Sequence, residues 1–473
     1  MIFNSSGFLL FLPLTFLVYW VIGSRQRNLQ NILILLASYV FYGWWDWRFL
    51  SLIGISTLAD FFISLNLSTS DSARKRKGLL WLSLLLNLGL LGFFKYYNFF
   101  VDSLQAALIQ LGMNLHPWTL EIILPVGISF YTFQTLSYTL DIYHKKIIPT
   151  KDLISFAAFV AFFPQLVAGP IERAKHLLPQ FERERYFDLA EAIRGISMIL
   201  YGFVKKVVIA DRLAIYVDSV FGAVEAQNSL SLSIGLIFFS LQIYCDFSGY
   251  SLIARGVAKL FGFEIMINFN KPYLASSITQ FWRRWHISLS TWFRDYVYIP
   301  LGGNRISLPR TYVNIFLVFL LSGLWHGANW TFVIWGALHG VYQLIYLSYA
   351  KLVASPRKES WARTIGNTLL VYIAVCLAWV FFRVDSLPDA MLYLQKLGEG
   401  TLPTNLMQLS AEKGPFNLFL SVVGIGILLA SYLLPDQLKF RKPIQHVLFA
   451  SISIIIIITL GINGEPTFIY FQF

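Results

Sequence analysis

The 473-residue chain is poor in charge and in cysteine, and both shortages exclude whole classes of protein. Only 13% of its residues are Asp, Glu, Lys or Arg, against about 25% in an ordinary soluble domain. Hydrophobic residues make up 56% of the chain, which excludes a soluble enzyme and a disordered chain. The two cysteines, Cys245 and Cys376, each lie in an apolar run, so a disulfide framework and a cysteine metal site are also excluded.

Motifs of several common chemistries are missing as well. The sequence contains no Gly-x-Ser-x-Gly elbow, no phosphate-binding glycine loop and no His-x-x-x-His or His-Glu-x-x-His pair. We therefore expect neither a metal site nor a resident serine nucleophile, and no bound cofactor. No basic residue precedes the first apolar run, and no small-residue cleavage site follows it, so we interpret that run as an uncleaved helix.

Long apolar runs extend from one end of the chain to the other. A membrane helix needs roughly 20 apolar residues, and the runs predict an all-α polytopic membrane protein that forms one domain, 1–473. We expect breaks or kinks between 190 and 260, where charges and glycines interrupt the apolar pattern. The predicted helices are 7–23, 29–46, 48–67, 79–100, 118–142, 153–169, 190–220, 229–260, 311–325, 329–350, 366–383, 416–434 and 446–462.

The basic residues predict the orientation. They lie in short loops, as at 25–27, 74–77, 145–151, 351–363 and 439–442, whereas 98–117 has no Lys or Arg and 385–412 is acidic. Because cytoplasmic loops carry an excess of Lys and Arg, both termini are expected outside the cytoplasm. The same loops account for the net charge of +12, so nucleic acid is not expected as a partner.

Two charge-rich stretches, 170–189 and 271–310, interrupt the apolar pattern. They could be large cytoplasmic loops. They could also be re-entrant segments, because irregular backbone at membrane depth must be buried in protein or line a wet cavity. We favour re-entrant segments that build a site. In the second stretch, three cations and three Trp interleave between 280 and 296, which suits either an interfacial helix or a basic rim for an anionic ligand.

His326 is the main candidate for acid–base chemistry. It lies between two apolar runs, and an ionisable group at that depth is expensive and usually functional. A neutral imidazole can take a proton from a hydroxyl, although a hydrogen-bonded packing histidine is also possible. If the segment is helical, Asn329 and Trp330 share the face of His326 and could orient or cover it. His339, 13 positions on, need not share the site.

Six motifs and the C-terminal sequence resemble the membrane-bound O-acyltransferases, in particular the bacterial branch of alginate O-acetylation. The resemblance runs nearly end to end. It rests on PVGISFYTFQ at 125–134, FFPQLVAGPIER at 162–173, YCDFSGY at 244–250, FWRRWH at 281–286, YIPLGGNR at 298–305, WHG at 325–327 and FIYFQF at 468–473.

The resemblance implies re-entrant segments around a central tunnel, with His326 as the deep family histidine and His286 at the family's second polar position. The implied donor is cytosolic acetyl-CoA. The implied acceptor is an extracytoplasmic polysaccharide, often reached through a separate partner enzyme of the SGNH-hydrolase type. On this basis His326 is the expected base, and His286 or Asn329 donates to the oxyanion or orients the base.

Cations and other motif residues are the candidates for binding substrate. Arg173 and Arg284 are the first choices for the CoA phosphates, because guanidinium groups form charge-assisted bonds to phosphate. The further candidates are Lys205, Lys206, Arg283 and Arg294 for the phosphates, and Gln134, Asp246, Trp325 and Trp330 for other parts of the substrates. Alternatives stay open: peptidoglycan O-acetylation, D-alanylation of teichoic acid, or a polysaccharide or lipid transporter. The sequence does not identify the polymer.

Overall fold

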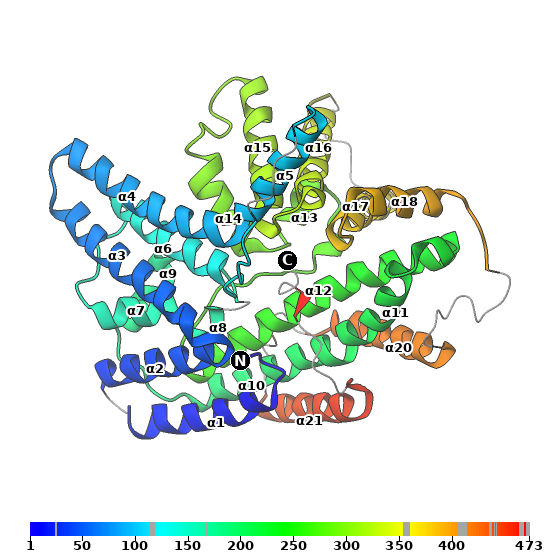
Figure 1. Ribbon diagram of the computed structural model, residues 1–473. Helices are drawn as coiled ribbons and strands as arrows, with labels where there is room; N and C mark the ends of the chain where they lie inside the picture. Colours follow the sequence, from blue (N-terminus) through cyan, green and yellow to red (C-terminus); the bar gives the residue numbers. More distant parts are fainter. Residues whose placement is uncertain are drawn as a thin grey trace. The chain divides into compact units, whose positions relative to one another are not determined.

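The computed structural model is helical throughout the part of the chain that it describes (Figure 1). That part comprises residues 1–23, 26–113, 119–166, 169–352, 360–403, 414–434, 438, 440, 442–462 and 468–469, and it contains no strand. The predicted all-α fold is confirmed. The residues of the predicted motifs and basic loops that lie outside these ranges are Arg25, Val167, Ala168, 353–359, Lys439, Arg441, Tyr470, Phe471, Gln472 and Phe473.

The chain forms two compact units. The first comprises Met1–Gly195 and Ala254–Met266, and the second comprises Ile196–Ile253 and Ile267–Phe473. The helices α10 (Leu189–Phe203) and α12 (Ser229–Leu260) contribute residues to both. Each unit is described by itself below, and the single domain 1–473 stays a prediction.

The first unit contains the N-terminal helices. They are α1 (Ser6–Val21), α2 (Arg27–Asp46), η1 (Trp47–Phe49), α3 (Leu50–Thr69), α4 (Ala73–Leu91), η2 (Gly92–Tyr96), α5 (Tyr97–Gln110), α6 (Ile128–Tyr143), α7 (Leu153–Ala161), α8 (Phe163–Leu166) and α9 (Ala174–Phe181). Within it, α3, α4 and α6 pack together around a buried carboxylate. Asp60 accepts hydrogen bonds from Asn87 Nδ2 at 2.8 Å, from Thr139 Oγ1 at 3.1 Å and from Ser83 Oγ. These donors satisfy a polar group that lipid could not.

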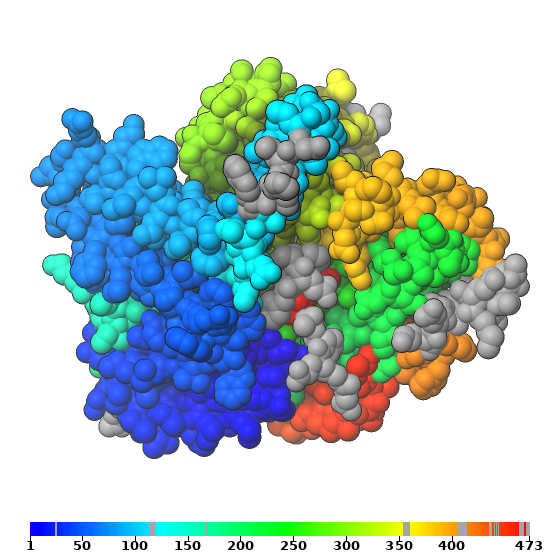
Figure 2. Space-filling model, in the orientation of Figure 1, coloured from blue at the N-terminus to red at the C-terminus, as the bar shows by residue number. Residues whose placement is uncertain are grey.

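The outer face of α3 and α4 is apolar. The space-filling view shows these helices as a continuous blue surface (Figure 2), and their exposed side chains include Leu58, Phe62, Trp81, Leu85 and Leu88. An apolar exterior is what a helix in contact with lipid requires, because lipid tails solvate apolar side chains.

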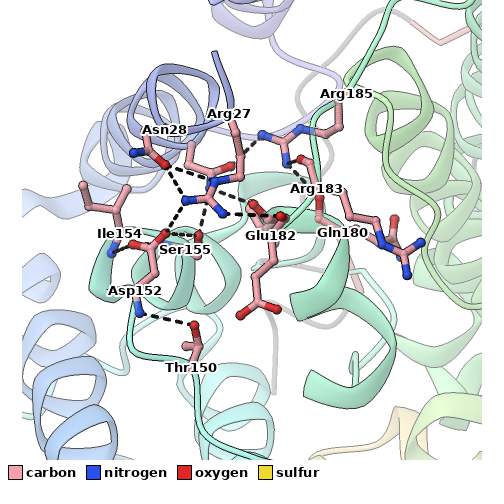
Figure 3. A network of polar contacts seen from close by, with 12 residues as sticks. Arg27, Asn28, Thr150, Asp152, Ile154, Ser155, Gln180, Glu182, Arg183 and Arg185 are labelled. Atoms are coloured by element: carbon pink, nitrogen blue, oxygen red, sulfur yellow. Dashed lines mark hydrogen bonds and ion pairs between the residues drawn. The ribbon is translucent and has the colours of Figure 1, made fainter. Parts of the chain in front are cut away.

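A polar network closes one end of the first unit and incorporates the charge-rich stretch 170–189 (Figure 3). Arg27, at the start of α2, pairs with Asp152 at 3.6 Å. Asp152 caps α7 by accepting from the backbone N–H of Ile154 and Ser155. Arg185 donates to the carbonyl oxygen of Gln180 at 2.7 Å. This stretch is therefore built into the unit through the buried apolar side chains of the short helix α9 and through the buried Arg185, whereas residues 182–184 and 186–189 are exposed.

The second unit contains the remaining elements. They are η3 (Val204–Ala210), α11 (Asp211–Phe221), η4 (Val224–Ala226), η5 (Pro272–Leu274), α13 (Ile278–Trp282), α14 (Ile287–Phe293), η6 (Arg294–Tyr298), α15 (Leu308–His326), α16 (Trp330–Leu352), α17 (Trp361–Arg383), α18 (Leu387–Gly398), α20 (Pro415–Ser431) and α21 (Pro443–Leu460). The helices α15 and α16 lie side by side (Figure 1) and form the most extensive helix–helix contact of the unit.

Five helical stretches of the described chain are long and apolar enough to cross a membrane: Arg27–Thr69, Ala73–Gln110, Ser229–Leu260, Leu308–His326 and Trp361–Arg383. Shorter apolar helices are Ser6–Val21, Leu153–Leu166, Pro415–Ser431 and Ile444–Leu460. The protein is thus a multi-pass membrane protein. The orientation of its termini and the exact number of spans stay predictions.

Several predicted boundaries are corrected. The predicted helix 118–142 begins only at Ile128, because Gly127 adopts a left-handed φ of 76° just before it. Residues 101–117, which the predicted helices 79–100 and 118–142 leave out, are helical as far as Gln110. Of the two segments expected to be kinked, 190–220 is interrupted by the π-helix η3, whereas 229–260 is one continuous helix.

Candidate active site

The charge-rich stretch 271–310 folds into short helices of the second unit, and the turn between α13 and α14 carries His286. Two backbone hydrogen bonds hold this turn against residues 268–270: Asn270 N–H donates to Arg284 O at 2.9 Å, and Ile287 N–H donates to Asn268 O at 3.0 Å. Between them His286 adopts a left-handed backbone, with φ 42° and ψ 54°. That conformation costs a non-glycine residue roughly 1–2 kcal/mol, so the surrounding contacts must impose it.

The side chain of Asn268 determines which nitrogen of His286 carries the proton. Asn268 Oδ1 accepts from the backbone N–H of Ser288 at 3.2 Å and from Ser288 Oγ at 2.9 Å. Because a backbone N–H can only donate, the atom that receives it must be the amide oxygen. The same oxygen lies 3.2 Å from His286 Nδ1, so Nδ1 donates to it. The lone pair of the neutral ring is then on Nε2.

His286 is fully buried among aromatic rings. Its ring centroid lies 4.7 Å from that of Phe247, 5.8 Å from Trp325 and 6.2 Å from His326. Burial lowers the pKa of His286 to about 3, because these surroundings disfavour the charged form. The imidazole is therefore neutral at physiological pH and presents an acceptor nitrogen.

His326 is the last residue of α15, and close packing of α15 on α16 positions it. A Cβ built on Gly323 would lie 2.2 Å from the carbonyl oxygen of Phe332, and one on Gly336 would lie 2.4 Å from that of Phe319. Only glycine permits this approach. Gly327 follows His326 in an extended conformation and ends the helix. The negative end of the helix dipole favours the positive charge that His326 acquires when it takes a proton.

His326 is 3% exposed and is enclosed by aromatic rings. Trp325 and Trp335 lie at centroid distances of 5.0 Å each, and Phe382 of α17 lies at 5.4 Å. The ring of Trp335 contacts both His326, at 5.0 Å, and His339, at 4.8 Å. His339 therefore belongs to the next layer of the same aromatic cluster.

A cavity of about 1160 Å³ in the second unit is lined by α13, α14, α15 and α16. Three cations line it, Arg283, Arg294 and Lys351, and no Asp or Glu is among its described lining residues. Its wall includes Ile287, the neighbour of His286, and Trp282, whose ring lies 4.9 Å from His339. The cavity is thus lined by cations, and its wall includes a sequence neighbour of one buried histidine and a ring that contacts another. This arrangement suits an anionic ligand whose reactive end faces the histidines.

The predicted helical face of Asn329 and Trp330 is wrong, because α15 ends at His326 and α16 starts at Trp330. Asn329 lies in the link between them. Its Oδ1 accepts from Thr331 N–H at 3.0 Å, and its Nδ2 donates to Asp385 O at 2.7 Å. Trp330 is 51% exposed. Asn329 thus joins the start of α16 to the end of α17.

The predicted phosphate-binding cations separate into different places. Arg283 and Arg294 line the cavity, whereas Arg284 donates to the carbonyl oxygen of Leu274 at 3.2 Å. Arg173 precedes α9 in the first unit and is half-buried. Gln134, also in the first unit, is buried and donates to the carbonyl oxygen of Phe159 at 2.7 Å. A role in binding substrate stays a prediction for all of these residues.

Asp246, Lys206 and Asp211 form a buried ion cluster in the second unit. Lys206 Nζ lies 2.9 Å from Oδ1 of each aspartate. Asp246 Oδ2 also accepts from Ile469 N–H at 2.9 Å, near the C-terminus. Lys205, one position earlier, lies 4.9 Å from the ring centroids of both Tyr201 and Tyr244. These contacts stabilise the unit, and a role of Asp246, Lys205 and Lys206 in binding substrate stays a prediction.

Sequence reasoning missed Asn268, Trp335 and Phe382. None belongs to a motif noted in the sequence, and each reaches the site from a separate segment, so no local spacing could reveal it.

In the part of the chain that the structure describes, no group of three His, Cys, Asp or Glu could hold a metal ion. Two buried imidazoles in aromatic surroundings suit proton transfer from a hydroxyl during acyl transfer.

Comparison with known proteins agrees with this chemistry. Residues 34–385 match the model of the MBOAT, or membrane-bound O-acyltransferase, family. The match includes His286, His326, Asn268 and the lining of the cavity, and it includes residues of both compact units.

Three curated relatives match different shares of the chain. A probable alginate O-acetylase of Pseudomonas aeruginosa is 46% identical over 394 residues, which cover 82% of this chain and 73% of the relative. A peptidoglycan O-acetyltransferase of Helicobacter pylori is 36% identical over 451 residues, which cover 88% of this chain and 83% of the relative. A teichoic acid D-alanyltransferase of Bacillus subtilis is 29% identical over 270 residues, which cover 54% of this chain and 67% of the relative.

Proposed function

Because the chain belongs to the membrane-bound O-acyltransferase family, we propose that it takes an acetyl group from cytosolic acetyl-CoA for the O-acetylation of an extracytoplasmic polysaccharide similar to alginate. The protein is a multi-pass membrane O-acyltransferase. This membership favours an enzyme over the transporter considered from the sequence. The finer parts of the proposal are the donor, the acceptor and the route between them.

One observation carries the proposal: a buried pair of imidazoles lies beside a cavity lined by cations. The ring centroids of His286 and His326 are 6.2 Å apart. The cavity wall includes Ile287, next to His286, and Trp282, which contacts the aromatic cluster around His326. The phosphates of CoA would bind Arg283, Arg294 and Lys351, with the thioester directed toward the imidazoles.

In the proposed reaction, the acceptor hydroxyl attacks the thioester carbonyl. A C–O bond forms, the C–S bond breaks, and the hydroxyl proton passes to His326 and then to the CoA thiolate. His286 offers an acceptor nitrogen, so it orients a neighbouring N–H or O–H group. This replaces the expectation that His286 donates to the oxyanion, since its proton is held by Asn268. A positioned base of this kind typically accelerates proton transfer by about 10²- to 10⁴-fold.

The proposed setting is a bacterial inner membrane with both termini outside the cytoplasm. The final acetylation of the polysaccharide would proceed through a separate SGNH-type enzyme, which receives the acetyl group on the outer side. The relatives named alginate O-acetylase, with 46% identity in one case, support alginate or a similar exopolysaccharide as the polymer. Peptidoglycan is the second candidate, because the relative named for it matches 88% of the chain. D-alanylation of teichoic acid is less supported, at 29% identity.

The experiment is turnover of radiolabelled acetyl-CoA by protein purified in detergent, with water as the acceptor, so that labelled acetate and CoA are released. Wild type is compared with His326→Ala. We expect CoA release by the wild type and a loss of at least about 100-fold in the variant, as for removal of a general base. His144→Ala is the matched control, because this exposed histidine follows α6 in the first unit, and its turnover should equal that of the wild type. Normal turnover by a well-folded His326→Ala protein would refute the proposed role.

A further inference from the structure

The rings around His326 form a closed wall made by three helices. Trp325 belongs to α15, Trp335 to α16 and Phe382 to α17, and none of the three side chains is more than 4% exposed. Their centroids lie 5.0 to 5.4 Å from that of His326, in edge-to-face contact. Aromatic rings at these separations are in van der Waals contact, so they leave little space beside the imidazole.

Further aromatic rings pack against the rings of this wall. Phe382 lies 4.9 Å from Phe332, 5.1 Å from Trp379 and 5.3 Å from Trp335. Trp335 and Trp379 stack at 5.7 Å. A ring of the wall can therefore turn away only if its neighbours also move. Close-packed interiors resist such rearrangement, so the space available at His326 is a fixed property of the fold.

This wall has a consequence for the acyl group. The thioester carbonyl must approach the attacking oxygen to about 3–3.5 Å, close to the base, so the acyl chain must point into the space beside His326. In an open apolar pocket, each further methylene would bind more tightly by about 0.8 kcal/mol. Against a closed wall it instead displaces a packed ring, and crowding of this kind typically costs 1–3 kcal/mol.

We propose that Phe382 and Trp335 limit the transferred group to acetyl by occupying the space that a longer acyl chain would need. This proposal rests on the proposed function, and it specifies how large an acyl group the same active site accepts. In the proposed binding mode the cavity of about 1160 Å³ holds the CoA part of the donor, which all acyl-CoA molecules share, so the cavity does not select the acyl group. Selection takes place at the wall around His326. The reaction, with its bonds and proton transfer, is the one described above.

The test compares kcat/KM for acetyl-, propionyl-, butyryl- and hexanoyl-CoA, measured as release of the CoA thiol. The wild type should prefer acetyl over butyryl by at least tenfold, since one excess methylene in a fitted pocket is worth about 10- to 200-fold. Phe382→Ala should lower this preference at least tenfold. Phe382→Leu and Trp335→Phe, which disturb packing less, should lower it by smaller factors. The preference is a ratio within one preparation, so it does not depend on the fraction of folded protein.

Phe239→Ala is the matched control. Phe239 is fully buried in α12 and contacts Trp379 at 6.5 Å, one ring further from the site. Its acyl preference should equal that of the wild type. Equal rates for acetyl- and butyryl-CoA in the wild type would overturn the proposal, and so would an unchanged preference in both Phe382 variants. Absence of any acetyl-CoA turnover in the wild type would instead refute the proposed function, and the size limit with it.

Discussion

Asn268→Leu should reduce catalysis without weakening the binding of the donor. Leucine has a similar size but no acceptor atom, so it removes the oxygen that receives His286 Nδ1, Ser288 N–H and Ser288 Oγ. A buried donor without a partner costs about 1–3 kcal/mol. The left-handed backbone of His286, which costs about 1–2 kcal/mol, also loses a neighbour that holds it. We expect the free energy of unfolding to fall by about 2–4 kcal/mol.

The catalytic effect follows from the orientation of the imidazole. Without the oxygen of Asn268, the proton of His286 can occupy either nitrogen, and the ring can turn within the loop. A misplacement of about 1 Å at a reacting centre costs about 100-fold in rate, so kcat should fall by about 10- to 100-fold. The KM for acetyl-CoA should change less than threefold, about 0.7 kcal/mol, because Asn268 does not line the cavity. Thiol release measured over a range of acetyl-CoA concentrations separates the two constants.

Asn268→Asp is the matched control and gives a pH signature. Asn268 Nδ2 donates no hydrogen bond within the described residues, so the carboxylate keeps every contact that the amide makes. The wild-type pKa of His286 is about 3, so the ring stays neutral above pH ~5 and activity should not follow its titration. A carboxylate beside it favours the charged ring and raises that pKa. The variant should therefore lose activity as the pH falls through the raised pKa, while the wild type does not.

A wild-type kcat in Asn268→Leu would refute this reasoning, as would identical pH profiles of Asn268→Asp and wild type. A purely structural role would lower the amount of folded protein in both variants. It would not separate kcat from KM, and it would not introduce a new acid limb into the profile. The three proteins should be compared at equal concentrations of folded protein, judged by thermal unfolding in detergent.

Two further sets of variants test the cavity and the buried ions. Arg283→Ala and Arg294→Ala should each raise the KM for acetyl-CoA about three- to tenfold, because each removes a cation from the cavity lining. The effect should be smaller at high salt, because both side chains are exposed and salt screens their charges. Arg284→Ala decides between the cavity and the role predicted for Arg284 from the sequence: Arg284 does not line the cavity, so an unchanged KM assigns the phosphates to the cavity cations. Lys206→Met leaves two buried carboxylates without their cation, a loss of about 3–5 kcal/mol that thermal unfolding should detect. Lys396→Met breaks a more exposed pair and should cost at most about 1 kcal/mol.

The helices of the second unit were predictable because their signal is local. The runs 311–325, 329–350 and 366–383 correspond to α15, α16 and α17 within a few residues. Apolar length alone determines such segments in a membrane protein, since each helix satisfies its own backbone hydrogen bonds. His326 was found for a similar reason, because a polar residue between two apolar runs is visible without knowledge of its neighbours. His286 lies in a charge-rich stretch and was proposed through the family resemblance.

The surroundings of the histidines were not predictable, because they depend on contacts between distant segments. Phe382 and Trp335 reach His326 from two other helices, and Asn268 lies 18 positions before His286. The prediction for Asn329 failed on a local detail. Gly327 takes an extended conformation, which ends α15 and removes the helical spacing on which that prediction depended.

Burial alone would not have distinguished the catalytic candidates from a packing histidine. His286, His326 and His339 are all at most 3% exposed. His339 lies in the middle of α16, where the aromatic cluster contacts it on several sides, and a helix interior gives its ring no special backbone geometry. His286 instead lies in a left-handed turn just before the short helix α14. His326 is the last residue of the long helix α15, at the negative end of the helix dipole. The C-terminal end of a helix provides a fixed negative field for a transient positive charge, so His326 is the position at which a buried imidazole can move a proton, whereas the left-handed turn before α14 holds His286 in place to orient a neighbouring group.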